Sequence, residues 1–365
     1  MRYEIIPFLM FFYRPPTSLF AGVFLCKKGK QMKKTAEAVS LGHPDKTADY
    51  ISSYILDRMI AQDPEVKYAV EVMIKDNTVV LGGEIKGNVD LSNLEEFVKN
   101  ALREIGYDEL YADRWGNYAI DVRRLNIINL IGKQSSEITQ GVATGWGDQG
   151  VFVGYACKGD GLISKEQYLT RLLNNALYIK ARDSKNLGID IKTQITLNDF
   201  DHIETAVVAI PMLVPEDLTV FIVQTLGEIP DNLIVNGTGT FKTHSSVADC
   251  GVTGRKLACD FYGTSAPIGG GSPWTKDGSK ADVTLNLYAR KLAVQYLADN
   301  DECFVYLSSC IGRFELPSAV VKTFKDGICN VQKLQIMKRP SEIIAELGLN
   351  KPVFAELCLK SLFSC

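Results

Sequence analysis

The sequence predicts an α+β chain with repeated layers of antiparallel sheet and helices outside them. Paired β-rich runs joined by tight turns recur along the chain, and segments with apolar residues at helical spacing separate them. With 365 residues, 46% of them hydrophobic and 23% charged, the chain can bury a substantial core in two or three packed units. Recurrent groups of hairpin and helix are typical of α+β proteins.

The first such group begins at Pro44, where apolar residues recur at helical spacing as far as Met59 and proline suits the first helical position. Two β-rich runs, 67–75 and 78–85, then form a predicted hairpin around the turn residues Asp76-Asn77. The same two periodicities predict helices at 91–105, 165–181, 215–226, 283–297 and 341–347 and strands at 118–122, 126–131, 151–155, 192–197, 202–210 and 304–311.

Charge and cysteine usage narrow the class of protein. A net charge of −3 provides no overall basic surface, which argues against nucleic acid as a partner. The nine cysteines are odd in number and scattered, and they lack any CxxC pair. They indicate reduced thiols in a cytoplasmic protein and no zinc site.

The N-terminal stretch differs from the rest of the chain. An apolar run from Ile5 to Tyr13 is interrupted by Pro7 and is followed by basic residues. It is too short to span a membrane and lacks the uninterrupted apolar run of a signal peptide. We therefore expect residues 1–31 to be a non-core extension, with Met32 the better start, and we expect no membrane partner.

The stretch Gly42–Lys46 puts a histidine, a carboxylate and an amine at the start of the first predicted helix. In the first turn, Asp45 is favoured by the helix dipole and could hold a metal ion beside a phosphate chain. An ordinary helix cap with a surface histidine and lysine would give the same pentapeptide. Farther on, the stretch Asn236–Gly271 combines eight glycines with charged residues, which is rare in a simple linker.

Several cations and several carboxylates recur at such positions, a combination that suits a polyphosphate carried with magnesium. A lone member would be no more than a solvated side chain or a surface ion pair, so only the combination carries weight. The sequence contains no GxxxxGK phosphate loop, nucleophilic-serine elbow or kinase catalytic loop. The candidate residues are His43, Asp45, Glu71, Glu84, Gln134, Asp148, Lys192, Asp249, Arg255, Lys256, Lys276, Lys280 and Asp282.

Six motifs follow one another along residues 35 to about 300: Gly42-His43-Pro44-Asp45-Lys46, Gly82-Gly83-Glu84, Gly132-Lys133-Gln134-Ser135, Gly147-Asp148-Gln149-Gly150, Asp249-Cys250-Gly251-Val252-Thr253-Gly254-Arg255-Lys256, and Gly269-Gly270-Gly271 with Lys276-Asp277 and Lys280 to Asp282. In their order they resemble the signatures of the S-adenosylmethionine synthetases, also called methionine adenosyltransferases. The resemblance implies that the methionine sulfur attacks the ribose C5′ of ATP and expels triphosphate, which is hydrolysed to pyrophosphate and phosphate.

The resemblance also implies a role for each candidate residue. The implied catalytic residues are His43, Lys192, Arg255, Lys256, Lys276 and Lys280. The implied ATP-binding residues are Glu37, His43, Asp148, Lys192, Phe241, Asp249, Arg255 and Lys256. Methionine would contact Glu84, Gln134, Asp249 and Lys280, magnesium would bind Asp45 and Asp282, and potassium would bind at Glu71.

The family's fold implies three similar α+β subdomains around a pseudo-threefold axis, with flat sheets at a dimer interface. Their approximate ranges here are 32–135, 136–260 and 261–365, interleaved in sequence. The family also builds each active site from two subunits, so we expect a homodimer or homotetramer with shared sites.

Three stretches depart from the family pattern. The loop between Gln140 and Asp148 is short, His244-Ser245-Ser246 replaces a Gly-Gly-Pro run, and the tail from Phe354 is clipped or divergent. These departures leave two alternatives to an active synthetase. One is a catalytically weakened nucleotide-binding or regulatory subunit, and the other is an enzyme that only hydrolyses polyphosphate.

Overall fold

Three four-stranded sheets form the framework of the protein in the computed structural model, which describes residues 34–133 and 145–361. At the centre of each sheet, two strands pair as an antiparallel hairpin. These hairpins are β2 (Lys67–Lys75) with β3 (Thr78–Lys86), β6 (Lys192–Leu197) with β7 (Ile203–Ala209), and β10 (Glu302–Ser309) with β11 (Ser318–Lys325).

Each hairpin has one further strand on either side. The flanking strands are β9 (Gly251–Val252) and β4 (Asn126–Lys133) in the first sheet, β1 (Lys34–Val39) and β8 (Asn232–Val235) in the second, and β5 (Gly150–Cys157) and β12 (Ile328–Lys333) in the third. The predicted α+β class is confirmed, but β4 pairs parallel to β3 and β8 parallel to β7. In each of these two pairs, helices lie between the two strands in the sequence, because parallel strands need a crossover connection.

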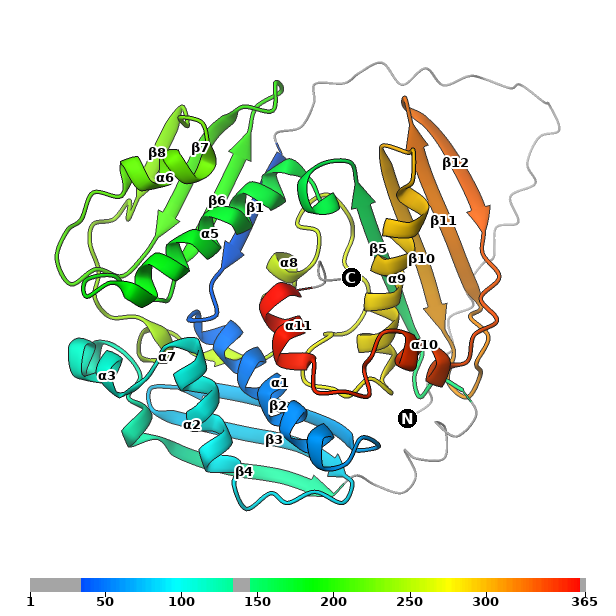
Figure 1. Ribbon diagram of the computed structural model, residues 1–365, viewed down its shortest axis with the longest axis horizontal. Helices are drawn as coiled ribbons and strands as arrows, with labels where there is room; N and C mark the ends of the chain where they lie inside the picture. The colour runs from blue at the N-terminus through cyan, green and yellow to red at the C-terminus, as the bar shows by residue number, and fades with distance from the viewer. Residues whose placement is uncertain (1–33, 134–144, 362–365) are drawn as a thin grey trace, which may run out of the picture. The chain divides into compact units, whose positions relative to one another are not determined.

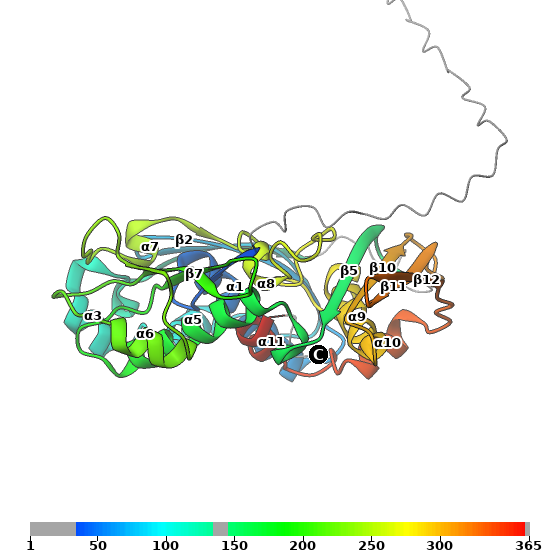
Figure 2. The same ribbon diagram turned by 90° about the horizontal axis from the view of Figure 1, so that it is seen from above.

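The helices cover the sheets mainly from one side. They are α1 (Pro44–Gln62), α2 (Leu94–Ile105), α3 (Glu109–Trp115), α5 (Lys165–Asp183), α6 (Thr219–Leu226), α7 (Ser245–Ala248), α8 (Leu257–Asp260), α9 (Ala281–Leu297), α10 (Pro340–Glu346) and α11 (Phe354–Lys360). Contacts place α1 on β2, α5 on β1 and β6, and α9 on β5 and β10. Figure 1 shows α1, α8 and α11 between the three sheets, and Figure 2 shows α5, α6 and α11 on one side of the strands.

The helix α1 is buried along most of its length, and this fixes the position of its N-terminus. His43 is the N-cap, and its Nδ1 accepts the N–H of Asp45 at 3.2 Å. Near the other end, the carboxylate of Asp57 accepts the first two N–H groups of α11, from Phe354 at 2.8 Å and Ala355 at 2.9 Å. The helix is therefore anchored both to the sheet below it and to the C-terminal helix.

The strand predicted at 118–122 is wrong, because this stretch contains parts of two short 3-10 turns, Gly116–Tyr118 and Val122–Arg124. The side chain of Asp121 accepts the N–H of Arg123 at 2.9 Å and caps the second turn, which competes with extended backbone. Several short elements are absent from the prediction. β9 has two residues and β12 exposes all six of its residues, so neither carries a periodic apolar signal.

Some predictions lie outside the described residues, among them the extension 1–31, Gln134 and most of the short loop before Asp148. The described residues all belong to one compact unit, Lys33–Cys365, and the division into three subdomains stays a prediction. In the described part of the chain, no helix combines the length and the apolar character needed to cross a membrane.

We predict that Gly154→Ala destabilises the fold by about 2 to 3 kcal/mol, because overpacking of a close contact costs energy of this order. Gly154 lies in β5 against α9, where a Cβ atom would stand 1.9 Å from the carbonyl oxygen of Ala289. Gly82→Ala, on β3, is the matched control, since no atom lies within 4 Å of its new Cβ. Urea unfolding of both variants would measure the difference, and equal stabilities would contradict the observed packing.

Candidate functional site

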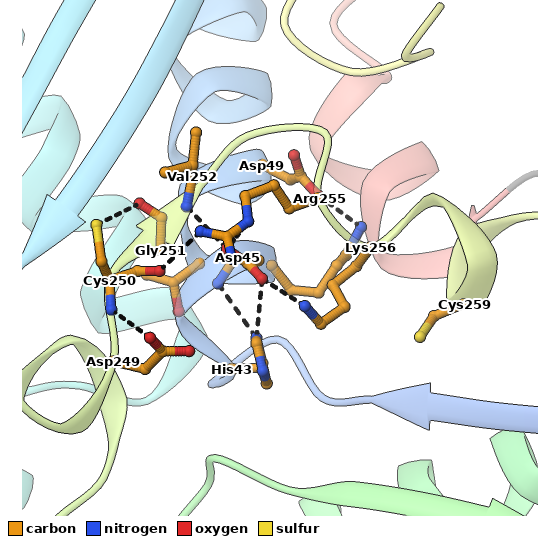
Figure 3. A network of polar contacts seen from close by, with 12 residues as sticks. His43, Asp45, Asp49, Asp249, Cys250, Gly251, Val252, Arg255, Lys256 and Cys259 are labelled. Carbon is orange, nitrogen blue, oxygen red and sulfur yellow. Dashed lines mark hydrogen bonds and ion pairs between the residues drawn. The ribbon is translucent and has the colours of Figure 1, made fainter. Parts of the chain in front are cut away.

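The start of α1 carries a buried carboxylate beside a buried histidine (Figure 3). Asp45 is 1% exposed and His43 is 6% exposed, and 4.0 Å separates the Nδ1 of His43 from Oδ2 of Asp45. Because this Nδ1 accepts the Asp45 N–H, the ring proton lies on Nε2, which is free to donate. The arrangement is thus more than a solvent-exposed helix cap.

A glycine-rich loop, Gly251–Lys256, begins with β9 and lies against the start of α1. The N–H of Val252 donates to Oδ1 of Asp45 at 2.9 Å. Gly251 permits the approach, because a Cβ there would lie 2.2 Å from the carbonyl oxygen of Pro44. The same loop brings two cations to Asp45: the Nζ of Lys256 lies 2.5 Å from Oδ2, and the Nε of Arg255 lies 3.8 Å from Oδ1.

These contacts set the charge of the site at neutral pH. Burial works against ionisation of Asp45, but hydrogen bonds from Lys256 and the Val252 N–H, with the charge of Lys256, hold its pKa below the usual value. Burial and the charge of Lys256, outweighing the opposing charge of Asp45, lower the pKa of His43 to about 4. At pH 7 the site therefore presents an ionised carboxylate, a neutral imidazole and two cations.

Two more predicted residues lie close enough to His43 to act on it electrostatically. Lys192 lowers the pKa of His43, and Asp249 raises it. Lys192 is exposed at the first position of β6, and Asp249 follows α7. The sequence analysis missed Asp190, two positions before Lys192, whose carboxylate accepts the Ser245 N–H at 2.8 Å and whose pKa burial raises to about 7.

The remaining predicted cations form a second cluster at the start of α9. The Nζ of Lys276 lies 2.6 Å from Oδ2 of Asp282, and the Nζ of Lys280 lies 2.6 Å from Oδ2 of Asp277. Asp282 packs against Gly271, where a Cβ would come within 2.1 Å of its carboxylate. Each predicted magnesium ligand is therefore paired with a lysine, in a different cluster.

The strand β2 holds both clusters along one edge. β9 pairs with its Met73 and Ile74, and farther along the same strand Ala69 forms a bridge with Lys276. Between the two contacts lies Glu71, whose carboxylate accepts hydroxyl hydrogen bonds from Thr253 and Thr275. The predicted potassium residue thus lies between the two cation clusters, among oxygen atoms.

Four other predicted residues make no hydrogen bond or ion pair with either cluster in the described ranges. Glu84 lies on β3 opposite Ala69, and Asp148 is exposed in the loop before β5. The carbonyl oxygen of Phe241 accepts the N–H of Met212, and Glu37 lies on β1 near Cys259. Within residues 34–133 and 145–361, no group of three His, Cys, Asp or Glu side chains could hold a metal.

Comparison with known proteins accounts for the motifs. Residues 31–136 match the family model described as "S-adenosylmethionine synthetase, N-terminal domain", and residues 243–364 match "S-adenosylmethionine synthetase, C-terminal domain". The chain belongs to the S-adenosylmethionine synthetase family. The two matched ranges contain both cation clusters described above.

Relatives and a solved structure agree with this membership. The chain is 33% identical to an S-adenosylmethionine synthase of Paramagnetospirillum magneticum, over 88% of this chain and 89% of the relative. It is 32% identical to one of Wolinella succinogenes, over 89% and 91%. The structure of "an Unusual S-adenosylmethionine synthetase from Campylobacter jejuni" matches with a TM-score of 0.81 and 29% identity, over 90% of this chain and 94% of the other.

In this synthetase-family chain, His244 is the N-cap of α7, whose C-cap is Asp249, and lies in an aromatic cluster with Tyr111 and Trp115. It is 1% exposed, and its ring packs edge-on against Trp115 with centroids 4.6 Å apart. Its Nδ1 donates to the carbonyl oxygen of Lys242 at 2.7 Å, so its Nε2 accepts the hydroxyl hydrogen of Tyr111 at 2.5 Å. The Tyr111 hydroxyl oxygen in turn accepts the N–H of Ile189 at 3.1 Å.

We predict that His244 makes stability fall with acid. Burial lowers its pKa from 6.5 to about 4, so the unfolded chain binds the proton more tightly, and stability present above pH 6.5 is lost toward pH 4. Between pH 7 and pH 5 this amounts to about 2 kcal/mol. Urea unfolding would measure the free energy of unfolding at pH 7 and at pH 5. The loss of this free energy from pH 7 to pH 5 should be smaller by about 2 kcal/mol in His244→Phe than in the wild-type protein. An identical pH dependence in both proteins would contradict the prediction.

Proposed function

We propose that this protein synthesises S-adenosyl-L-methionine from L-methionine and ATP. The methionine sulfur forms a bond to the ribose C5′, the bond from C5′ to the triphosphate breaks, and water then cleaves the triphosphate to pyrophosphate and phosphate. The pairing of a buried, ionised Asp45 with Lys256 beside a neutral His43, in a chain of this family, carries the proposal.

The seven described cysteines are free thiols, which supports a cytoplasmic location.

The residues fit a reaction that needs no general base. A thioether sulfur attacks as a neutral nucleophile, so catalysis depends on orientation and on stabilising the leaving triphosphate. His43 can donate its Nε2 proton to an oxygen of the leaving group. Arg255 and Lys256, which lie on the loop, contact the triphosphate. Lys192, Lys276 and Lys280 add further positive charge, as the family resemblance implies.

Asp45 and Asp282 are suited to magnesium because each is a carboxylate beside a cation that can turn to a phosphate oxygen. Magnesium keeps several waters and takes only one or two carboxylates together with substrate phosphates, so three protein ligands are not required. When bound, it would neutralise charge on the triphosphate. Glu71, with the hydroxyls of Thr253 and Thr275, provides the all-oxygen surroundings that suit potassium.

The substrate-binding roles of the other residues are part of the same proposal. Asp148, Phe241 and Glu37 would bind ATP together with Asp249. Glu84 and Gln134 would bind methionine, with Asp249 and Lys280. Among these, Glu84 shares the uncovered face of the first sheet with Glu71, since the β2–β3 register places both on the side away from α1.

The same face supports assembly into a homodimer or homotetramer. Met73, Ile128 and Leu130 are 43%, 40% and 64% exposed, and the strand registers align them on one side of the sheet. Exposed apolar patches of this kind mark protein interfaces. We propose that two copies pair through this face and that Glu84 and Gln134 of one subunit complete the site around His43 of the other.

We predict that the protein, incubated with methionine, ATP, magnesium and potassium, yields S-adenosylmethionine together with phosphate and pyrophosphate. Mass spectrometry would detect the S-adenosylmethionine. Phosphate release without this sulfonium product would instead indicate a polyphosphate hydrolase. ATP binding with neither product would indicate a regulatory subunit.

We predict that Lys256→Met lowers kcat in this assay by about a hundredfold to a thousandfold, because it removes a cation that stabilises the leaving group.

We also predict that two inactive variants restore activity in one dimer. His43→Asn keeps an N-cap acceptor for α1, and Glu84→Gln is nearly isosteric. A heterodimer isolated through two different tags has one site with both substitutions and one with neither, so it should recover about half of the wild-type rate. A heterodimer as inactive as both parents would mean that the sites are not shared.

A further inference from the structure

We propose that Asp49 is a positioning residue that holds the Gly251–Lys256 loop against α1 and so places Arg255 and Lys256 over Asp45. The inference rests on the proposed function, to which it adds a residue that acts through the loop. Asp49 follows Asp45 by four positions, one helical turn along the same face of α1. Both carboxylates accept backbone N–H groups of the loop. Figure 3 shows the two aspartates beside Val252, Arg255 and Lys256.

The spacing of these two contacts defines the loop's path. Asp45 accepts the N–H of Val252 at 2.9 Å, and Asp49 accepts the N–H of Gly254 at 2.8 Å. Gly254 has φ of +72°, a left-handed conformation that favours glycine, and the two cations follow immediately. Without the second contact the loop would be held to α1 by the Val252 N–H and by Arg255 and Lys256 themselves, so the two cations would have to fix the loop as well as bind phosphate.

Asp49 is itself held by a buried ion-pair network. It is fully buried, and its Oδ2 accepts a hydrogen bond from the Nζ of Lys46 at 3.2 Å. Lys46 also donates to Asp260 at 2.8 Å and lies 4.8 Å from the ring centroid of Trp274, whose Nε1 donates to Asp260 at 2.8 Å. Asp260 further accepts the Ser361 hydroxyl at 3.2 Å, so the network joins α1 to three other segments.

Both oxygens of Asp49 are used as acceptors, which determines what a substitution does. Lys46 and Gly254 donate to different oxygens of Asp49, and in Asp49→Asn an NH2 group replaces one of these oxygens, so the side chain cannot accept at both positions. The charged lysine takes the oxygen, because hydrogen bonds to charged donors are the stronger ones. The NH2 group then faces the Gly254 N–H, two donors meet, and the loop moves away from α1.

The first test compares Asp49→Asn with Asp57→Asn. Asp57 lies on the same helix and also accepts two N–H groups, but those belong to α11, so its loss removes a helix cap without touching the loop. We expect Asp49→Asn to lower kcat about a hundredfold, the order expected for a misplacement of about 1 Å, while Asp57→Asn stays within about twofold of wild type. Equal kcat values in the two variants would overturn the proposal.

A second measurement does not depend on catalysis and so separates this proposal from the proposed function. Amide hydrogen exchange, followed by mass spectrometry, should quicken at Gly251–Lys256 in Asp49→Asn and stay unchanged there in Asp57→Asn. Calorimetric binding of inorganic tripolyphosphate with magnesium should weaken about tenfold or more in Asp49→Asn alone. Unchanged exchange of the loop would overturn the positioning role even if the wild-type protein makes no S-adenosylmethionine.

If Asp49→Asn does not fold, Gly254→Ala tests the contact from the loop side. A side chain at φ of +72° strains the turn, while the new Cβ meets only the side chain of Ser272 at 3.4 Å. We expect kcat to fall and the loop amides to exchange faster. Wild-type values of both in Gly254→Ala would overturn the proposal.

Discussion

The docking of the Gly251–Lys256 loop on the N-terminal half of α1 is the interaction on which the site depends. Asp45 is buried, and burial alone would favour its neutral form. The loop supplies the backbone N–H and the lysine that keep it ionised, and Asp45 in turn holds the loop in place. The ionised state of Asp45 therefore depends on the loop, and the position of the two cations on the loop depends on Asp45.

The strand β2 extends this constraint to the second cluster. It pairs with β9 at one end and forms the bridge to Lys276 at the other. A single extended strand therefore sets the spacing of two later segments, the Gly251–Lys256 loop and the segment that carries Lys276. Because a strand is stiff and rises by about 3.3 Å per residue, the separation of the two clusters is built into the backbone. Glu71 lies midway, with a threonine hydroxyl from each segment on its carboxylate.

The sequence predicts the parts of this site that depend on local chemistry. The helix at Pro44 and the hairpin of β2 and β3 follow from periodicity, and His43, Asp45 and Lys256 come from motifs that the structure brings into contact. The strand at 118–122 fails because the side chain of Asp121 caps a turn, a contact that periodicity does not register. The position of Gln134 stays a prediction.

The supporting network could not be predicted, because its members look ordinary in the sequence. Lys46 and Asp49 are charged residues three apart on a helix, a spacing typical of a surface ion pair. Only the tertiary structure shows that both are buried and that Asp260 and Trp274 close over them. The one local signal is the four-residue spacing of Asp45 and Asp49, which places two carboxylates on the same helix face.

His244, which departs from the family pattern, is buried, and its contacts tie together two segments of the site. A buried histidine would be costly if charged, but Lys242 and Tyr111 satisfy both ring nitrogens of its neutral form. The next residue, Ser245, donates its N–H to Asp190, two positions before Lys192. The His244-Ser245-Ser246 run thus ties the segment that leads to Asp249 to the strand that begins at Lys192, and the neutral His244 ring adds no charge to these contacts.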